Sequence, residues 1–281
     1  MYKILVTGSG GYIGRHVVKT LLDMGHNVIA ADFNNDGVDE RAFKINESIF
    51  DLKENAYKAL NEPDVCLHMA WRNGFVHNNP THMEDLSAHF TFLKNMIEAG
   101  VKKVAVMGTM HEIGYWEGAI DENTPCNPLS LYGIAKNALR QSLLQIMQEK
   151  DIDFYWLRAF YILGDDLRNH SIFSKIIKME NEGQKTFPFT NGKNLYDFIT
   201  VSDLAKQIAM SITQDKITGI INVCTGNPTS LSDKVNEFIE QNNLNIKPQY
   251  GAFPDRKYDS PGVWGDATKI NEIVKNFEEQ K

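Results

Sequence analysis

A glycine-rich turn near the start of the chain limits its fold more than any other feature. The stretch Thr7–Gly14 joins an apolar run at Lys3–Thr7, typical of a buried strand, to an amphipathic run at Tyr12–Met24, typical of a helix. Residues without a Cβ at such a junction let backbone N–H groups and the helix N-terminus approach a pyrophosphate. Glycine-rich turns also occur as packing devices, but the place of this one between strand and helix predicts a dinucleotide site. The turn residues expected to bind the dinucleotide are Gly8, Gly11, Tyr12, Ile13 and Gly14.

Short apolar runs alternate with longer amphipathic stretches over the first two-thirds of the chain, which is the pattern of parallel strands joined by helices. Further strands are expected at Asn27–Ala31, Val65–His68, Val104–Met107 and Phe154–Arg158, and further helices at His82–Ala99 and Tyr132–Lys150. The sequence therefore predicts an α/β fold, a Rossmann-type doubly wound parallel sheet with a smaller C-terminal substrate-binding lobe.

The alternation becomes less regular after Gly164, where connections containing Gly and Pro separate the elements. Helices are expected there at Ser171–Glu182, Val201–Thr213 and Leu231–Gln241, and a strand at Ile220–Cys224. We expect an NAD(P)-binding domain at 1–163, to which 195–224 returns, and a smaller substrate-binding lobe at 164–281.

The second expected strand ends in a carboxylate, Asp32. A carboxylate at this point accepts hydrogen bonds from the adenosine ribose hydroxyls and repels the 2′-phosphate of NADP. No arginine follows Asp32 immediately to offset that repulsion, so NAD is favoured and NADP stays an alternative. The other interpretation is that Asp32 simply ends the strand in solvent. Phe33 is expected beside the cofactor, and Asp51 with Leu52 is a weaker candidate for the adenine pocket.

Composition and charge disfavour several classes of protein. The 281 residues carry a formal net charge of -7, which gives general nucleic-acid binding little electrostatic support. No apolar run approaches the ~20 residues needed to span a bilayer, and the first residues are typical of a strand rather than of a signal peptide. Three cysteines far apart form no metal-ligand spacing and no disulfide framework. We expect a cytoplasmic protein that uses no metal and binds neither nucleic acid nor membrane.

A tyrosine and a lysine four residues apart, Tyr132 and Lys136, open the helix expected after Pro128. This spacing places both side chains on one helical face. An ammonium beside a phenol favours the phenolate, so we expect Lys136 to lower the pKa of Tyr132 from about 10 toward the working pH. Such a phenol donates a proton to a carbonyl oxygen as hydride reaches the carbon, or removes it in reverse. Thr109, after the fourth strand, is expected to hydrogen-bond the reacting oxygen; alternatively it closes the strand as a turn residue.

Together these residues resemble the extended short-chain dehydrogenase/reductase family, specifically its nucleotide-sugar epimerases, dehydratases and 4-ketoreductases. The likeness covers most of the chain and is much more specific for the family than for the reaction. The stretches that carry it are Thr7–Gly14, Asp32, His68–Ala70, Thr109, Asp121–Pro128 running into Tyr132 and Lys136, Leu157–Arg158, and Tyr196–Ala205.

The resemblance implies a catalytic set of Thr109, Tyr132 and Lys136, an NAD(P) site along the strand ends, and a lobe that grips a nucleoside-diphosphate sugar. It also implies a homodimer formed through the helices expected at His82–Ala99 and Tyr132–Lys150. Further cofactor-binding residues are expected to be Met69, Ala70, Trp71, Phe160 and Ile162, together with Tyr132 and Lys136. The expected substrate-binding residues are Arg72, Met110, His111, Tyr161, Tyr196 and Arg256. As alternatives, His111 is a loop histidine without a catalytic role and Arg256 is a surface arginine.

Departures from the family pattern favour one reaction over others. The 4,6-dehydratases resemble one another in a Thr-Asp-Glu triplet, whereas this chain has Thr-Met-His at 109–111, with Glu112 displaced by one residue. The acid and base of water elimination are therefore missing. The stretch 160–162 places an aromatic residue where related epimerases usually have a sugar-binding asparagine, and Tyr196 stands where many have a phosphate-binding arginine. Both changes argue against a UDP-galactose-type epimerase site.

Three functions fit this pattern. The first is NAD(P)H-dependent reduction at C4 of a nucleotide-linked 4-keto hexose, such as a thymidine-linked 4-keto-6-deoxy sugar, with Tyr132 as the proton donor. The second is a nucleotide-sugar 4-epimerase that uses the same catalytic set and retains NAD tightly. The third is a non-catalytic relative that senses NAD(H), which the presence of both Tyr132 and Lys136 disfavours.

Overall fold

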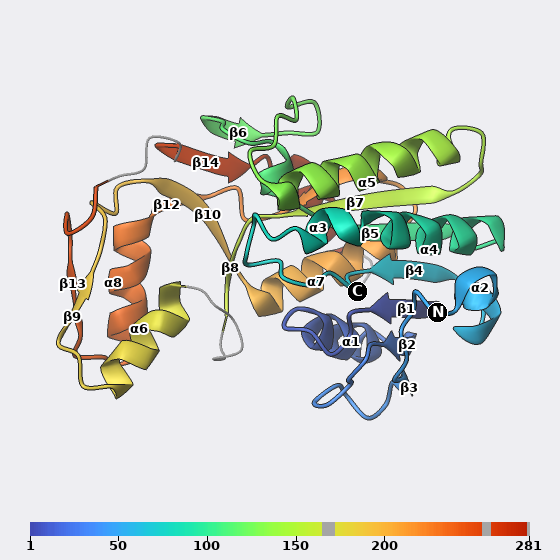
Figure 1. The fold of residues 1–281 in the computed structure, drawn as a ribbon, viewed down its shortest axis with the longest axis horizontal. Coiled ribbons are helices and arrows are strands. Elements are labelled where there is room, and N and C mark those ends of the chain that lie inside the picture. Colours follow the sequence, from blue (N-terminus) through green and yellow to red (C-terminus); the bar gives the residue numbers. More distant parts are fainter. Residues whose placement is uncertain (165–171, 255–259, 280–281) are drawn as a thin grey trace.

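The computed structural model describes residues 1–164, 172–254 and 260–279. Within this part of the chain, seven parallel strands form one large sheet in the order β11-β7-β5-β4-β1-β2-β3 (Figure 1). These strands are β1 (Lys3–Thr7), β2 (Asn27–Ala31), β3 (Phe43–Ile45), β4 (Val65–His68), β5 (Lys103–Thr109), β7 (Asp153–Ala159) and β11 (Gly219–Val223). The strand order reverses between β1 and β4, and such sheets bind ligands outside the carboxyl ends of their strands at that point. The predicted Rossmann-type sheet is confirmed.

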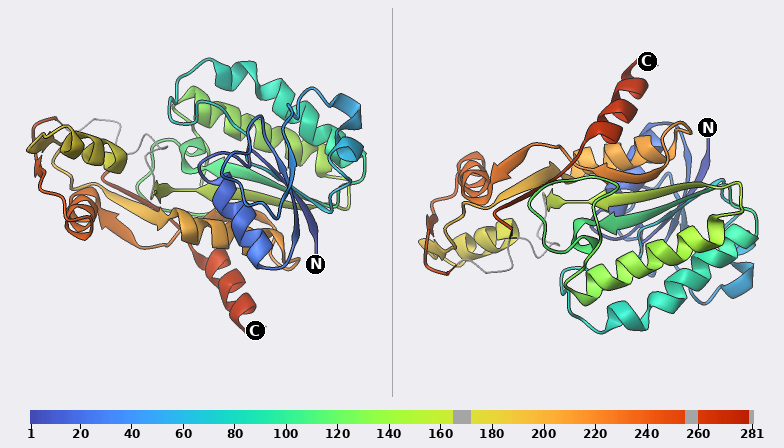
Figure 2. Two further views of the ribbon diagram at one scale, coloured as in Figure 1. Left: turned by 90° about the horizontal axis from the view of Figure 1, so that it is seen from below. Right: turned by 90° about the horizontal axis from the view of Figure 1, so that it is seen from above.

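Helices cover both faces of the large sheet. On one face lie α1 (Gly14–Asp23), α7 (Val201–Ile212) and α9 (Thr268–Glu278), and on the other α2 (Ala56–Ala59), α4 (Leu86–Glu98) and α5 (Leu131–Met147), as Figure 2 shows. Each face has its own apolar core. The helices form there because their buried residues recur every few positions; in α1, for example, Gly14, Val17, Val18 and Leu21 face inward.

Several predicted boundaries are wrong by up to three residues. The helix predicted at Tyr12–Met24 begins at Gly14, because the two residues before it still belong to the turn. The helix predicted at His82–Ala99 is divided at Asp85 into α3 (Thr81–Glu84) and α4. Strand β3 was not predicted, since three partly exposed residues at a sheet edge form too short a pattern. Helix α9 was also missed.

A second sheet forms the smaller lobe beside the carboxyl ends of the large sheet's strands (Figure 1). Its order is β12-β10-β14-β6, with β8 paired to β10, while β9 pairs with β13. These strands are β6 (Gly118–Ile120), β8 (Tyr161–Leu163), β9 (Thr186–Pro188), β10 (Leu195–Thr200), β12 (Pro228–Ser230), β13 (Lys247–Gln249) and β14 (Gly262–Gly265). Helices α6 (Ile172–Asn181) and α8 (Leu231–Gln241) enclose a third apolar core there. The predicted lobe is present, but its sheet was missed because its strands are short and come from distant segments.

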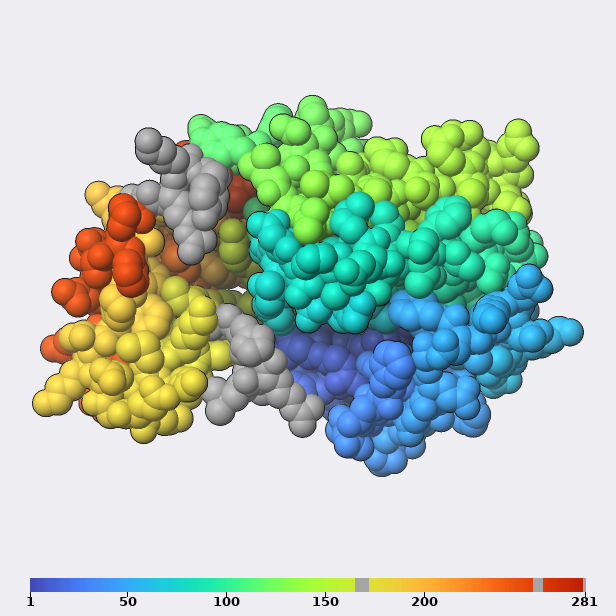
Figure 3. Space-filling model, in the orientation of Figure 1, coloured from blue at the N-terminus to red at the C-terminus, as the bar shows by residue number. Residues whose placement is uncertain are grey.

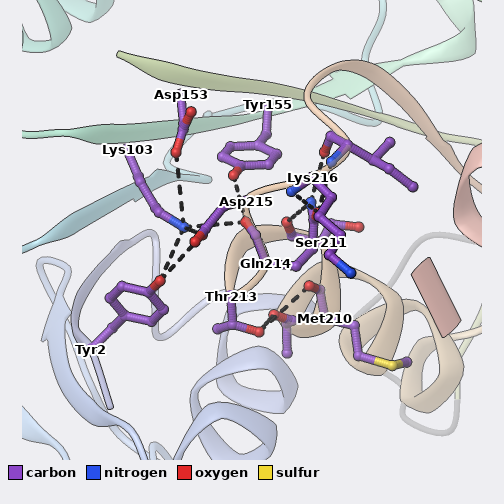
Figure 4. Close-up of polar contacts among 12 residues, drawn as sticks. Tyr2, Lys103, Asp153, Tyr155, Met210, Ser211, Thr213, Gln214, Asp215 and Lys216 are labelled. Carbon is purple, nitrogen blue, oxygen red and sulfur yellow. Dashed lines mark hydrogen bonds and ion pairs between the residues drawn. The ribbon is translucent and has the colours of Figure 1, made fainter. Parts of the chain in front are cut away.

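A buried lysine at the amino end of β5 ties the large sheet to the turn after α7 (Figure 4). The Lys103 ammonium pairs with Asp215 and donates hydrogen bonds to Tyr2 Oη and to the Gln214 carbonyl oxygen, both at 3.2 Å. Tyr155 Oη donates to the same carbonyl at 2.6 Å. The turn between α7 and β11 is therefore fastened to β1, β5 and β7 by polar contacts. No helix in the described ranges is both long and apolar enough to cross a membrane.

Candidate active site

The glycine turn closes against two neighbouring backbone segments at the end of β1. Gly8 has a φ of +70°, and a Cβ there would lie 2.7 Å from the Ala70 nitrogen. A Cβ on Gly10 would lie 1.9 Å from the Asn34 carbonyl oxygen. Both positions therefore require glycine. Sequence reasoning did not assign Gly10 to the site, although it is one of the glycines of the same turn. Figure 3 shows the surface hollowed over the dark blue N-terminal segment, below the cyan segment.

The remaining turn residues lead directly into α1. They are the predicted cofactor residues Gly11, Tyr12, Ile13 and Gly14. Helix α1 begins without a side-chain cap at its N-terminus. The N-terminal N–H groups of a helix carry partial positive charge and favour an anion. The turn and the uncapped helix therefore suit a pyrophosphate.

Asp32 lies next to this turn, at the end of β2. Its Oδ2 accepts a hydrogen bond from Gly10 N at 3.1 Å, and its Oδ1 accepts one from Phe33 N at 2.7 Å. The carboxylate is thus fixed beside the glycine turn, and its contact with a ribose hydroxyl stays a prediction. Phe33 is 72% exposed. The predicted adenine residues Asp51 and Leu52 lie in the turn after β3. A cavity of about 180 Å³ lies beside them, lined by Ile49, Phe50, Lys53 and the α4 residues Ser87, Ala88, Thr91, Phe92 and Asn95.

Thr7 ties the loop after β4 to the end of β1. Its Oγ1 accepts hydrogen bonds from Met69 N at 3.1 Å and Ala70 N at 3.2 Å, and it lies 2.9 Å from His68 Nδ1. His68 Nε2 in turn lies 2.8 Å from His89 Nδ1. Burial holds the pKa of both imidazoles well below the usual range, so both rings are neutral at pH 7. The predicted cofactor residues Met69 and Ala70 thus lie directly against the glycine turn.

The predicted catalytic tyrosine stands in the first turn of α5. This helix begins at Ser130, whose hydroxyl accepts a hydrogen bond from Gly133 N at 3.2 Å. Tyr132 N donates to the His77 carbonyl oxygen at 2.9 Å, which fastens the helix start to the loop after β4. The Thr109 hydroxyl lies close enough to the Tyr132 phenol to favour its charged form and so to lower its pKa. Thr109 is 5% exposed, at the end of β5, so the structure brings two of the three predicted catalytic residues near each other.

Lys136 lies on the same face of α5 but does not contact the phenol oxygen. Its Nζ donates to the Met107 carbonyl oxygen at 2.8 Å and lies 3.9 Å from the centre of the Trp71 ring, against 5.9 Å from the centre of the Tyr132 ring. Burial lowers the pKa of Lys136 to about 7, although the Glu112 carboxylate opposes this. The third predicted catalytic residue is therefore close to the phenol but turned toward an indole.

The prediction that Lys136 lowers the pKa of Tyr132 is wrong for the protein by itself. Burial raises the pKa of Tyr132 to about 12, and the Thr109 hydroxyl offsets only part of this rise. The phenol is therefore protonated at neutral pH. A protonated phenol is ready to give its proton to a developing alkoxide, which is the direction that a carbonyl reduction needs.

Four aromatic side chains surround the Tyr132 ring. His77 stacks on it, with ring centres 5.5 Å apart and an interplanar angle of 13°, and His82 lies at 5.2 Å. Trp71 and His111 are both 6.2 Å away. Sequence reasoning did not single out His77 or His82. Their position soon after a strand's carboxyl end, with His77 on the loop after β4 and His82 in α3, was the signal available, but that signal does not say which residues fold back onto α5.

Two of the predicted substrate-binding residues lie in the short 3-10 helix 110–112 that follows β5. His111 is partly buried, with its ring centre 4.2 Å from that of His77, while Met110 is buried in the apolar core. Burial lowers the pKa of His111 to about 4. Arg72 is exposed and paired with Asp85, to which its Nη2 donates at 2.8 Å. Of these three, the structure brings His111 next to Tyr132.

The other predicted residues in the described ranges lie where the chain passes between the large sheet and the second sheet. Tyr161 on β8 and Tyr196 on β10 have ring centres 4.3 Å apart. Phe160 is buried and Ile162 partly buried, and both belong to the core on the α1 side of the large sheet or pack against it. Arg256 lies outside the described residues.

Glu112, the carboxylate displaced from the dehydratase pattern, is fully buried beneath the site. Its Oε1 accepts hydrogen bonds from Trp156 Nε1 at 2.6 Å and from Thr109 N at 3.0 Å. Its Oε2 lies 3.2 Å from Arg140 Nε, and Arg158 Nε lies 3.8 Å from Oε1. Glu112 therefore fixes the end of β5 and does not face a substrate, which agrees with the missing elimination pair.

Comparison with known proteins places this arrangement in a family. Residues 4–224 match the NAD dependent epimerase/dehydratase family. A curated relative, the dTDP-6-deoxy-L-talose 4-dehydrogenase (NAD(+)) of Aggregatibacter actinomycetemcomitans, is 46% identical over 269 residues, which are 93% of this chain and 98% of that protein. A putative UDP-glucose 4-epimerase of Methanocaldococcus jannaschii is 27% identical over 289 residues, 98% of this chain and 91% of that protein.

Solved structures support the same fold. A UDP-glucose-4-epimerase of Stenotrophomonas maltophila, with bound NAD and formylated UDP-arabinopyranose, has a TM-score of 0.85 at 18% identity and covers 98% of this chain and 93% of its own. A UDP-glucose 4-epimerase of Thermotoga maritima has a TM-score of 0.80 at 22% identity and covers 99% of each chain. At these identities the likeness speaks for the fold alone. The family match and the 46% identical relative go further, and this chain belongs to the NAD-dependent epimerase/dehydratase family.

Proposed function

We propose that this chain is an NAD-dependent oxidoreductase that reduces the 4-keto group of a dTDP-linked 4-keto-6-deoxy hexose to a hydroxyl, and runs the reverse oxidation when NAD is in excess. The observation that carries the proposal is the 46% identity, over almost the whole of both chains, to a dTDP-6-deoxy-L-talose 4-dehydrogenase. The protonated Tyr132 phenol beside Thr109 supports it, because a reduction needs an acid at this point.

The residues of the glycine turn, the start of α1 and the end of β2 fit a dinucleotide. The uncapped start of α1 suits the pyrophosphate, and the Asp32 carboxylate suits the ribose hydroxyls and opposes the 2′-phosphate of NADP. Bound NADH supplies the hydride. We assign to the cofactor Gly8, Gly11, Tyr12, Ile13, Gly14, Asp32, Phe33, Asp51, Leu52, Met69, Ala70, Phe160, Ile162, Tyr132 and Lys136.

The proton comes from this chain's own side chains. Tyr132 gives its phenolic proton to O4 of the sugar as negative charge develops there, and the Thr109 hydroxyl holds the phenol in place. The nearby Lys136 ammonium stabilises the phenolate that is left. His111, next to Tyr132, is the best placed of the proposed sugar contacts, with Arg72, Met110, Tyr161, Tyr196 and Arg256 kept as further candidates.

A nucleotide-sugar 4-epimerase is the second candidate, since several relatives below 30% identity carry that name. An epimerase uses Tyr132 as base in its first half-reaction and as acid in its second, and the reverse oxidation by a dehydrogenase needs the same base, so the pKa of Tyr132 does not separate the two reactions. The two reactions differ in the fate of the cofactor. A reductase consumes one added NADH for each keto sugar, whereas an epimerase interconverts hexose nucleotides on retained NAD without added reductant.

We further propose a homodimer in which α4 and α5 of two copies pack together. These helices lie side by side, and two exposed apolar side chains lie near their N-terminal ends: Met83 in α3, just before α4, is 41% exposed, and Ile134 in the first turn of α5 is 39% exposed. An Ile134→Glu substitution is expected to shift the sedimentation coefficient from that of a dimer to that of a monomer; a wild-type protein that sediments as a monomer contradicts the proposal. A cytoplasmic location and the division into 1–163 with 195–224, and 164–281, also stay predictions.

A further inference from the structure

Trp71, on the loop after β4, covers the catalytic lysine. The Lys136 nitrogen lies 3.9 Å from the centre of the indole ring and donates its hydrogen bond to the Met107 carbonyl oxygen. The indole also stacks on His89, with ring centres 4.3 Å apart and an interplanar angle of 14°. Lys136 is only 2% exposed. The indole thus stands where water would otherwise solvate the ammonium.

A second histidine holds the indole in this place. Trp71 Nε1 donates to His82 Nδ1 at 3.0 Å, and His82 Nε2 lies 3.1 Å from the Val76 carbonyl oxygen. An indole N–H only donates and a carbonyl only accepts, so the network assigns His82 a neutral ring with its proton on Nε2. His82 is 1% exposed. The loop 72–80 is thereby linked through one imidazole and one indole to the lysine.

Other ionisable groups around Lys136 do little to keep it charged. The His68 and His89 rings are neutral because burial lowers their pKa, and the Tyr132 phenol is protonated because burial raises its pKa. The Glu112 carboxylate favours the ammonium, but it is already bound by two arginines and an indole. The face of an aromatic ring attracts a cation, indole most strongly, and more so where water is excluded.

We propose that Trp71 is a positioning residue that keeps Lys136 in its ammonium form and holds it against the end of β5, and that His82 acts through Trp71. This assigns the indole a role toward the lysine in place of the direct cofactor contact expected from the sequence. The inference concerns the charge of Lys136 and holds whichever sugar is the substrate. For catalysis, it rests on the proposed function, because Lys136 has to be charged to stabilise a phenolate.

The expected effect is an ordered fall in the pKa of Lys136. Removing the indole removes an attraction that exists only for the charged form, while an apolar side chain at this position still keeps water away from the ammonium, so the midpoint of about 7 should move lower. In Trp71→Leu we expect a shift of about one pH unit downward, with Trp71→Phe between this variant and the wild type. His82→Leu should shift the midpoint in the same direction by less, because the indole remains but is no longer held.

The test is a titration of lysine side chains by NMR on protein labelled with ¹³C at the lysine ε-carbons, without cofactor or substrate. Lys136→Met assigns the signal. Trp116→Phe is the matched control, since this indole also donates a hydrogen bond, to the Ala119 carbonyl oxygen at 3.0 Å, and has no contact with Lys136. We expect the titration midpoint of Lys136 to fall from the wild type to Trp71→Phe and further to Trp71→Leu. The midpoint should stay unchanged in Trp116→Phe. Equal midpoints in the wild type and both Trp71 variants overturn the proposal.

A second readout uses the cofactor but no sugar. If the ammonium binds a ribose hydroxyl, the dissociation constant for NADH, followed by fluorescence, should weaken with rising pH at a lower pH in Trp71→Phe than in the wild type. A uniform loss of affinity at every pH would assign Trp71 a purely structural or direct cofactor-binding role and contradict the inference. Neither readout uses a keto sugar. Both therefore test the role of Trp71 even if the proposed reduction fails, and the two failures can be told apart.

Discussion

Two ionisable groups one helical turn apart, the partly buried Tyr132 and the buried Lys136, have their pKa shifted in opposite directions. Burial disfavours whichever form is charged, so the phenol keeps its proton and the amine tends to lose one. The sequence pattern predicted the pair and its shared helical face correctly. It could not predict the direction of the phenol's pKa, because that depends on where the lysine chain points. Here it points toward Trp71 and Met107.

Replacing Tyr132 by Phe removes the proton donor and keeps the ring that the surrounding histidines contact. We expect kcat to fall by about 10²- to 10⁴-fold, with little change in the dissociation constant for NADH. Steady-state kinetics at pH 7 and NADH fluorescence titration measure the two quantities. Tyr155→Phe serves as control. The Tyr155 hydroxyl donates to the Gln214 carbonyl oxygen near the amino ends of the strands, so its removal should leave kcat unchanged. Full turnover by Tyr132→Phe would contradict the role of Tyr132 as the proton donor.

Asp32 is expected to decide between the two nicotinamide cofactors. An Asp32→Ser variant retains an acceptor near the glycine turn but removes the charge that repels a 2′-phosphate. The ratio of kcat/KM for NADPH to that for NADH should rise by about tenfold or more. Hydrogen bonds to charged groups are stronger than neutral ones by a free energy that corresponds to about this factor. Initial rates with each cofactor give the ratio. An unchanged ratio would leave Asp32 as a residue that merely ends β2.

At the scale of elements, the site depends on segments that are fastened at both ends of the sheet. The loop after β4, the start of α5 and the 3-10 helix after β5 meet at Tyr132, each tied by a backbone or buried side-chain hydrogen bond. At the amino ends of the strands, the ion pair between Lys103 and Asp215 holds the turn after α7. Breaking that contact should loosen an element without touching the chemistry.

The Lys103–Asp215 pair should make stability depend on pH. The hydrogen bond from Lys103 lowers the pKa of Asp215 below its ordinary value of 3.8, so its contribution is present above that pH and is lost as pH falls through the lower folded-state pKa. Asp215→Asn should therefore lower the free energy of unfolding at pH 7 by about 1 kcal/mol, a modest value because the aspartate is largely exposed. The difference from wild type should shrink near pH 3.

Urea denaturation at both pH values measures this difference. Glu98→Gln breaks an exposed i,i+4 pair with Lys94 and is the matched control, expected to change stability by less than about 0.5 kcal/mol. The same loss for Asp215→Asn at pH 3 and pH 7 would contradict an electrostatic origin. The Asp215→Asn variant is expected to keep its kcat, because the Lys103–Asp215 pair lies at the amino ends of the strands and the candidate active site lies at their carboxyl ends.

For the whole molecule, sequence reasoning succeeded where a pattern is long and local. The large sheet, its glycine turn and the Tyr132–Lys136 face all follow from periodicity and spacing within one segment. It failed where contacts join distant segments: the second sheet brings together residues near 119, 196 and 263 in short strands. His77 and His82, which also face Tyr132, escaped prediction, since only the path of the loop after β4 and of α3 brings them there.

The central claim, that this chain reduces a dTDP-linked 4-keto-6-deoxy hexose, is tested most directly by mixing the purified protein with that keto sugar and NADH. The account predicts loss of NADH absorbance, with one 4-hydroxy sugar nucleotide formed per NADH oxidised and a slower reaction with NADPH. NADH left unconsumed, while hexose nucleotides are interconverted without added reductant, would contradict it.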